Sequence, residues 1–275
     1  MKDSPRRDHR AASPAPRRAR RLGPPRGSPE GIWIAGRRAV TEAVRAGRAR
    51  EILVAAGSRQ TPGLLGLVEA AAASGLPLRE VPRSDLDGIA PDHQGVAARV
   101  TPPRPLTDRD LRRLAFGPDA VVVVLDGVTD PQNLGAAART AEAAGVDLLV
   151  TRERRSAPVT AAAVRASAGA LLHLPYARVV NLTRTLRWLA DEAAFTVVGL
   201  DEDAPASIHD EPCPPGRIAL VVGSEGEGMS RLVREACDQL VRVPMRGRVS
   251  SLNAAASLAA ALFGYVLPSR PLPTR

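Results

Sequence analysis

The chain of 275 residues has little cysteine, few aromatic residues and no long apolar run. Its two cysteines, Cys213 and Cys237, form no CxxC pair, which disfavours a disulfide scaffold and a zinc site and favours a reducing, cytoplasmic location. No run approaches the roughly 18 to 20 apolar residues of a membrane helix, and no apolar signal segment follows the basic N-terminus. We therefore expect neither a membrane partner nor a metal. Aromatic residues make up 3% of the chain, so an aromatic platform for stacking single-stranded nucleic acid is not evident.

Positive charge is concentrated at the N-terminus and is carried almost entirely by arginine, since Lys2 is the only lysine. Residues 1–30 hold nine basic residues against three acidic ones, so they carry +6 of the formal net charge of +9. Six prolines and a scarcity of large apolar residues predict that this segment is a disordered basic tail. Such a polycation binds nucleic acid without selecting its sequence.

The next region predicts a small α/β domain over residues 31–100. Helical periodicity appears at 37–47 and 62–74, and short apolar strands are expected at 52–55, 78–81 and 95–100. Three prolines then indicate a linker over 101–118.

Residues 119–268 predict a larger α/β domain built on a parallel sheet. The β-branched run 121–125 is typical of a strand buried on both faces. The other expected elements are strands at 147–150, 195–200, 218–223 and 240–243 and helices at 133–144, 160–168, 181–194, 230–236 and 252–265. In such doubly wound sheets, ligands bind outside the carboxyl ends of the strands.

Three polar segments follow strand ends in this larger domain. The first, 126–140, contains Asn133, expected as a helix N-cap, and Arg139, expected in the second turn of that helix. The second, 223–229, is rich in glycine but matches neither a dinucleotide fingerprint nor a phosphate loop. Its two glutamates suit a ligand that carries positive charge or hydroxyl and amine donors.

The third segment, 243–256, combines a basic edge with a helix start. Arg246 and Arg248 flank a glycine, and Ser250 or Ser251 is expected to cap the next helix. Taken singly, each of the three segments also fits an ordinary strand–helix turn.

Taken together, in this order, the three segments resemble the SpoU (TrmH-type) RNA 2′-O-ribose methyltransferases of the SPOUT class. The shared patterns are D-x-x-x-D-P-x-N-x-G-x-x-x-R-T, G-x-E-x-x-G and P-M-x-G-x-x-x-S-L-N, and the resemblance covers about 119–265. Upstream, Asp92-His93-Gln94-Gly95-Val96-Ala97 is similar to the segment that closes a small N-terminal substrate-binding domain in family members acting on ribosomal RNA.

The resemblance implies a catalytic domain with a deep trefoil knot that binds S-adenosylmethionine, and a homodimer with its active site near the subunit interface. It implies cofactor contacts at Gly223, Val243, Leu252 and the loop that begins at Leu200. It assigns activation or orientation of the ribose hydroxyl to Arg139, and it expects the other polar pattern residues, Asn133, Glu225, Ser251 and Asn253, to shape the site. Candidate contacts to RNA phosphates are Arg37, Arg38, Arg246 and Arg248.

The leading functional interpretation is 2′-O-methylation of a ribose in 23S rRNA, with guanosine as the expected nucleoside. Two alternatives within the family remain open, namely a transfer-RNA enzyme and an antibiotic-resistance methyltransferase acting on another ribosomal nucleotide. An alternative of a different class is a catalytically inactive RNA-binding assembly factor. The intact set of polar pattern residues weighs against this last interpretation.

Overall fold

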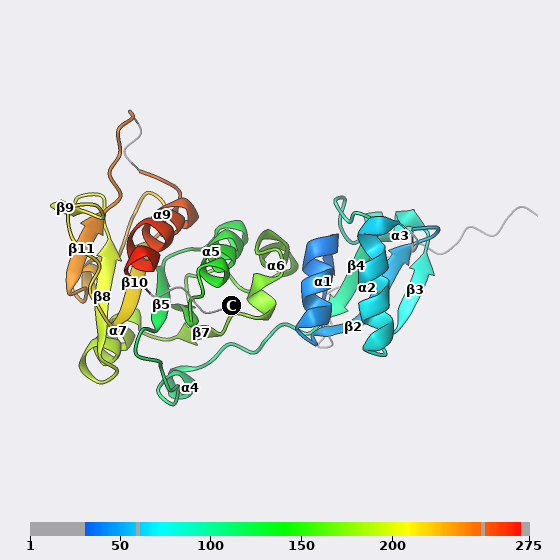
Figure 1. Cartoon of the computed structure of the whole chain (residues 1–275), viewed down its shortest axis with the longest axis horizontal. Coiled ribbons are helices and arrows are strands. Elements are labelled where there is room, and N and C mark those ends of the chain that lie inside the picture. The colour runs from blue at the N-terminus through cyan, green and yellow to red at the C-terminus, as the bar shows by residue number, and fades with distance from the viewer. Residues whose placement is uncertain (1–30, 59–60, 249–250, 271–275) are drawn as a thin grey trace, which may run out of the picture.

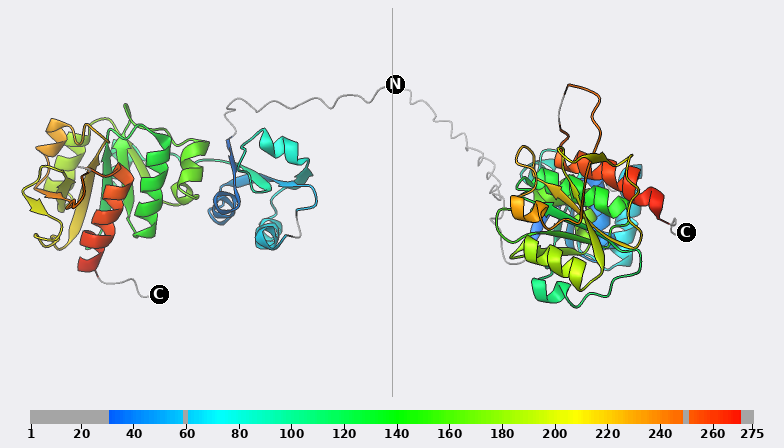
Figure 2. Two further views of the ribbon diagram at one scale, coloured as in Figure 1. Left: turned by 90° about the horizontal axis from the view of Figure 1, so that it is seen from above. Right: turned by 90° about the vertical axis from the view of Figure 1, so that its left-hand side faces the viewer.

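The computed structural model describes residues 31–58, 61–248 and 251–270. They form two α/β bodies that lie side by side along the long axis of the molecule (Figures 1 and 2). The basic tail predicted for residues 1–30 lies outside the described residues.

The small domain is an α/β body, as the sequence predicts, around a four-stranded sheet of order β1-β4-β2-β3. Strand β4 is antiparallel to both β1 and β2, whereas β2 and β3 are parallel. Its elements in chain order are β1 (Ile32–Ala35), α1 (Arg37–Arg45), β2 (Ala49–Ala55), α2 (Pro62–Ala73), β3 (Leu78–Val81), α3 (Arg83–Asp87) and β4 (Val96–Val100). The apolar residues of α1 recur at helical spacing, so that Ala39, Val40, Ala43 and Val44 are all buried.

The larger domain contains seven parallel strands in the order β7-β6-β5-β10-β8-β11-β9. Its strands are β5 (Val121–Asp126), β6 (Leu148–Arg152), β7 (Tyr176–Val179), β8 (Phe195–Leu200), β9 (Ala206–Ser207), β10 (Arg217–Gly223) and β11 (Gln239–Arg242). Its helices are α4 (Asp108–Leu111), α5 (Pro131–Ala143), α6 (Ala161–Ala166), α7 (Leu182–Asp191), α8 (Arg231–Arg234) and α9 (Ala254–Ala261). Short 3-10 turns at Ala170–Leu172 and Leu267–Ser269 and a π-helical turn at Leu262–Val266 complete it.

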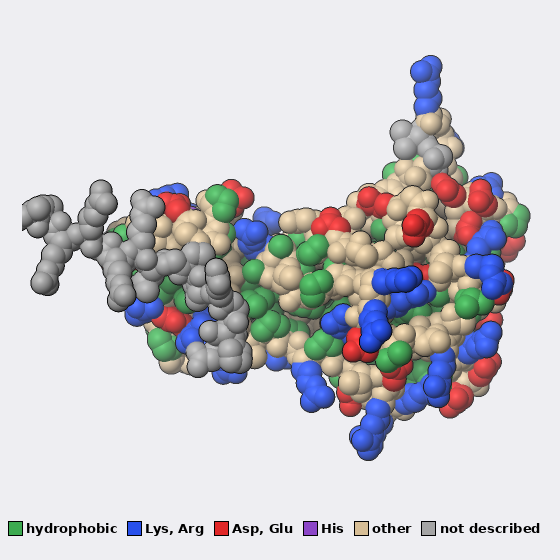
Figure 3. All heavy atoms as spheres, turned by 180° about the vertical axis from the view of Figure 1, so that it is seen from behind, with side chains coloured by type: hydrophobic (Ala, Val, Ile, Leu, Met, Phe, Trp, Pro, Cys, Tyr) green, Lys and Arg blue, Asp and Glu red, His purple; other side chains and the backbone are tan. Residues whose placement is uncertain are grey.

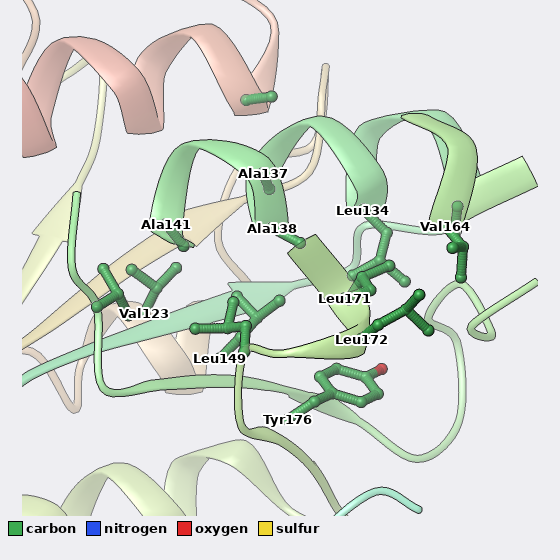
Figure 4. Close-up of a cluster of buried hydrophobic side chains, with 14 of the residues drawn as sticks. Val123, Leu134, Ala137, Ala138, Ala141, Leu149, Val164, Leu171, Leu172 and Tyr176 are labelled. Atoms are coloured by element: carbon green, nitrogen blue, oxygen red, sulfur yellow. The ribbon is translucent and has the colours of Figure 1, made fainter. Parts of the chain in front are cut away.

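Helices cover both faces of this sheet, which explains the unbroken apolar run of β5. Val123 and Leu125 belong to the core beneath α5 and α9, whereas Val122 and Val124 pack in the core on the α7 side. Figure 4 shows the first of these cores, where the alanines of α5 lie over Val123 and its neighbours. The prediction of a parallel sheet with helices on both sides is confirmed. The trefoil knot expected from the resemblance stays a prediction.

The two domains meet through packed side chains between α1 and the segment that follows α6. A Cβ atom on Gly169 would lie 2.5 Å from the Cβ of Glu42, so the backbones approach closely there. Glu42 Oε2 also faces His173 Nε2 at 3.0 Å, and one apolar core runs through both domains. The segment 101–118 joins the domains and includes α4, whose Thr107–Asp110 capping box starts the helix.

Candidate active site

Three predicted site residues from distant parts of the chain form one hydrogen-bond cluster at the carboxyl edge of the sheet. Asn133 Nδ2 donates to Glu225 Oε1 over 3.0 Å, and Asn253 Nδ2 donates to Asn133 Oδ1 over 2.9 Å. Asn253 Nδ2 also donates to Glu225 Oε1. The carboxylate therefore orients both amides, and the three polar segments singled out in the sequence meet at this cluster.

The start of α5 corrects one sequence prediction. Asp130, not Asn133, is the N-cap, and its carboxylate accepts from the Gln132 backbone N–H at 3.0 Å. Pro131 takes the first helical position, where a missing N–H costs nothing and its fixed φ suits the helix. Asn133 is consequently free to direct its amide toward Glu225.

The start of α9 corrects a second prediction. Its N-cap is Asn253, whose Oδ1 accepts from the Ala255 backbone N–H at 2.9 Å, so Ser251 is not the cap. Ser250, the other residue expected at this cap, lies outside the described residues. Asn253 thus uses its oxygen to start the helix and its Nδ2 to hold the cluster, a double role that needs an amide.

The loop that carries Glu225 is a tight hairpin. Ser224 and Gly228 exchange backbone hydrogen bonds of 3.0 and 3.1 Å. A Cβ on Gly223 would lie 2.1 Å from the carbonyl carbon of Gly228, so only glycine allows the two limbs to approach this closely.

Beside the cluster lies a cavity of about 320 Å³, formed by the loops that follow β8, β10 and β11. Gly223, Leu200, Val243 and Leu252, the four residues expected to contact the cofactor, all line it, and so do Glu225 and Ser251. Its remaining acidic lining comes from Asp201, Glu202, Asp203 and Glu227. Apolar walls combined with carboxylates fit a ligand that carries an aromatic ring, hydroxyl donors and a positive charge, which are the features of S-adenosylmethionine.

A buried carboxylate to which the sequence assigned no role, the first aspartate of the segment 126–140, fixes the far end of this hairpin. Asp126, 3% exposed, accepts from the Ser230 backbone N–H at 2.8 Å and from its hydroxyl at 2.7 Å. Its other oxygen pairs with Arg152 at 2.8 Å. Asp126 stands at the end of a buried strand, and that position was the available sequence signal for a structural carboxylate.

A thiol behind the cavity takes no part in nucleophilic chemistry. Burial raises the pKa of Cys237 to about 12, and the nearby carboxylates of Asp238 and Asp201 add to this shift. The thiol is therefore protonated near neutral pH, which disfavours the thiolate that could attack a substrate.

Arg139 lies away from the cluster. It is the ninth residue of α5 and falls in the third turn, not the second, because the helix begins at Pro131. Its side chain is exposed and has no hydrogen-bond or ion-pair partner among the described residues. It does not line the cavity. Its assigned role at the ribose hydroxyl stays a prediction.

The four arginines expected to contact RNA have different surroundings. Arg37 donates its backbone N–H to Gln94 Oε1 at 3.1 Å and its Nε to the Gln94 carbonyl at 3.3 Å, so it ties the start of α1 to the segment around Gln94. Arg38 is exposed, as are Arg246 and Arg248 on the loop that projects from the larger domain (Figure 1). Their contacts to RNA stay predictions.

Within the described residues, no group of three or more histidine, cysteine, aspartate or glutamate side chains is arranged to hold a metal ion. In the same part of the chain, no helix has the length and apolarity needed to cross a membrane.

Known proteins match both domains. The model of the SpoU rRNA Methylase family matches residues 120–263, and a model described as RNA 2′-O ribose methyltransferase substrate binding matches residues 33–106. An uncharacterized tRNA/rRNA methyltransferase of Mycobacterium ulcerans is 44% identical over 253 residues, covering 90% of this chain and 80% of the relative. The 23S rRNA (guanosine-2′-O-)-methyltransferase RlmB of Haemophilus ducreyi is 44% identical over 192 residues, covering 69% of this chain and 78% of the relative.

Solved structures agree with these matches. The crystal structure of the SpoU methyltransferase AviRb from Streptomyces viridochromogenes, in complex with the cofactor AdoMet, has a TM-score of 0.71 and 27% identity, with 86% of this chain and 89% of that chain covered. The chain therefore belongs to the SpoU rRNA methylase family and is an S-adenosylmethionine-dependent RNA methyltransferase with an N-terminal substrate-binding domain.

Proposed function

We propose that this protein methylates a ribose 2′-hydroxyl in 23S rRNA, and that the target nucleoside is a guanosine. The observation that carries the proposal is the cluster of Asn133, Glu225 and Asn253 beside the acidic cavity. The 44% identity to an RlmB protein named for that reaction supports the choice of 23S rRNA and guanosine.

The domain plan follows from the same interpretation. Residues 31–100 form the substrate-binding domain, 101–118 connect it, and 119–268 form the catalytic domain. The family matches at 33–106 and 120–263 support these boundaries. The predicted tail 1–30 adds positive charge for RNA.

S-adenosylmethionine supplies, when bound, an electrophilic methyl group on a positively charged sulfur. Leu200, Val243 and Leu252 would hold its adenine against apolar surface at the cavity walls. The carboxylates of Glu202 and Glu227, which also line the cavity, favour the positive charge of the ligand. Gly223 keeps the hairpin closed and so preserves the shape of the cavity.

The polar residues act on the ribose side. A ribose hydroxyl is a poor nucleophile near neutral pH, so it must be held in line with the bond that breaks. Asn133 and Asn253, oriented by Glu225, position the ribose, and Ser251 on the cavity lining shapes the same end. A guanidinium offers planar paired donors and no acceptor, so the role we propose for Arg139 is to orient a phosphate and the hydroxyl, not to remove a proton.

We further propose a homodimer formed through α5 and α9, which lie side by side on one face of the sheet (Figure 1). Three residues of these helices are exposed, namely Arg139 and Ala143 of α5 and Ala256 of α9. Phe263, in the π-helical turn that follows α9, is 51% exposed. A second copy on this face would bury the phenylalanine and enclose Arg139, which has no partner within the described part of one chain.

The test is methylation in vitro with radiolabelled S-adenosylmethionine, using total ribosomal RNA, total transfer RNA and intact ribosomal subunits, followed by mapping of the labelled nucleotide. Arg139→Ala serves as the inactive control. We expect label at one ribose, a guanosine of 23S rRNA. Label confined to transfer RNA, or at another ribosomal nucleotide linked to drug resistance, would replace the proposed substrate with that alternative. Absence of label together with absence of cofactor binding in calorimetry would favour the non-enzymatic interpretation.

A further inference from the structure

The loop between β6 and α6 presents two arginines with no partners. Arg154 and Arg155 are adjacent and exposed, and neither has a hydrogen-bond or ion-pair partner in the described part of the chain. Their neighbours Arg152 and Arg178 are engaged instead, with Asp126 and with the Glu153 carbonyl. Two guanidinium groups are thus left to bind something outside this chain.

The loop is held in place on both sides. The Glu153 backbone N–H donates to Val179 at the end of β7 over 2.8 Å, and the Ala157 N–H donates to the Val128 carbonyl over 2.9 Å. The Ser156 hydroxyl donates to the Arg152 carbonyl. Arg155 has a φ of 58°, a left-handed conformation that is unfavourable for a non-glycine residue and persists only where surrounding contacts impose it. A loop fixed in this way loses little backbone entropy when its side chains bind a ligand.

The backbone of the loop is joined to the segment that leads into the ribose end of the site. Val128 lies in the segment that leads into α5 and Asn133, and Gly127 in the same segment lies next to Ser224 of the cavity hairpin. In the other direction the loop leads into α6, which packs against β1 of the substrate-binding domain. The arginines therefore lie on a loop whose flanking segments contact the small domain on one side and the segment leading into Asn133 on the other.

The charge on the two sides of this segment differs in sign. The cavity side carries five acidic residues and one arginine, and that arginine, Arg234, pairs with Asp201. Figure 3 shows acidic side chains gathered at the base of the projecting loop and basic side chains elsewhere on the same face of the larger domain. A phosphate chain is repelled by the first surface and attracted by the second.

We infer that Arg154 and Arg155 form a phosphate-binding surface for the RNA strand that flanks the target ribose. The inference rests on the proposed RNA substrate. It goes further by specifying that the RNA strand reaches the site over the β6–α6 loop. Two adjacent guanidinium groups on a fixed backbone can each bind a phosphate of the strand, since guanidinium binds phosphate through paired donors.

The test compares Arg154→Gln/Arg155→Gln with a control of equal charge, Arg113→Gln/Arg187→Gln, in the full chain. Within the described residues, Arg113 and Arg187 are also exposed and form no side-chain hydrogen bond or ion pair. Arg113 follows α4 and Arg187 lies on α7, away from the segments that form the site. Binding to an in vitro transcript of 23S rRNA is measured from 50 to 200 mM salt, and S-adenosylmethionine affinity by calorimetry. We expect the slope of log K against log salt to fall by about 1.4 to 2 in the loop variant, with cofactor affinity unchanged.

A slope equal to that of the control would overturn the inference, provided that the wild-type chain methylates RNA. Failure of the wild-type chain to methylate any RNA would refute the proposed function instead, so the two failures are distinguishable. Weakened binding to ribosomal subunits with unchanged binding to the naked transcript would also overturn it, because the loop would then contact a ribosomal protein.

Discussion

At the carboxyl edge of the larger sheet, two groups of loops differ in charge although all of them follow parallel strands. Beyond β8, β10 and β11 the loops enclose a cavity lined with carboxylates, whereas beyond β6 the loop presents free arginines. Asn133, Glu225 and Asn253 lie at the boundary. We propose a division of labour in which the cavity takes the cationic cofactor, whereas the β6–α6 loop, together with Arg246 and Arg248 on the projecting loop after β11, takes anionic RNA.

The largest expected effect separates chemistry from cofactor binding. Arg139→Ala should abolish turnover, because the guanidinium that orients the hydroxyl is lost. S-adenosylmethionine affinity should stay within about twofold of wild type, since Arg139 does not line the cavity. Turnover is measured by methyl incorporation and affinity by calorimetry, and an equal loss of both would contradict the assignment.

The next largest effect is expected on cofactor affinity alone. Gly223→Ala places a Cβ 2.1 Å from the Gly228 carbonyl carbon, so the hairpin must open. We expect about tenfold weaker S-adenosylmethionine binding in calorimetry, with RNA affinity retained. Gly247→Ala is the matched control, because nothing lies within 4 Å of an added Cβ there. Equal behaviour of the two variants would show that the hairpin does not shape the cavity.

A third variant acts at the boundary. Asn253→Ala removes both the helix cap and the donor to Glu225, and turnover should fall by about 10- to 100-fold, as expected for a hydrogen bond to a charged group. Asn253→Ser restores a cap but not the donor, so it should recover thermal stability worth about 1 kcal/mol without recovering turnover. Recovery of turnover by the serine variant would assign Asn253 to helix capping alone.

The smallest expected effect concerns RNA binding by the N-terminal basic tail. Deletion of residues 1–28 should weaken binding to RNA and flatten its salt dependence, because eight arginines and Lys2 are removed. Activity at saturating RNA should hardly change. A filter-binding series in salt measures the slope, and an unchanged slope would mean that the tail takes no part in binding.

The sequence predicts the framework of the larger domain because its strands are strongly patterned. The run that became β5 is apolar at every position, and helices on both faces explain why. Strand β7 was missed because Tyr176–Val179 is only four residues long and includes Arg178. Strand β9 has two residues and pairs only with β11, so local pattern offers no signal for it.

The sequence predicted which residues form the candidate site, but not which hydrogen bonds those residues make. Each polar segment follows a strand end, so that Asn133, Glu225 and Asn253 could be expected at one edge. Which residue caps each helix depended on Pro131 and on the exact start of α9, and both N-caps differ from the prediction. The anchoring of Ser230 by Asp126 joins residues 104 apart, a contact that only the tertiary fold creates.

One crossed experiment tests the division of labour most directly. Glu202→Gln/Glu227→Gln removes two exposed carboxylates from the cavity lining, and Arg154→Gln/Arg155→Gln removes two arginines from the β6–α6 loop. Cofactor affinity and the salt slope of RNA binding are measured for both variants. We expect the first to lose about tenfold in S-adenosylmethionine affinity with an RNA slope no shallower than that of wild type, and the second to lose RNA slope alone. If each variant impaired both ligands equally, the cavity and the β6–α6 loop would not be separate binding surfaces.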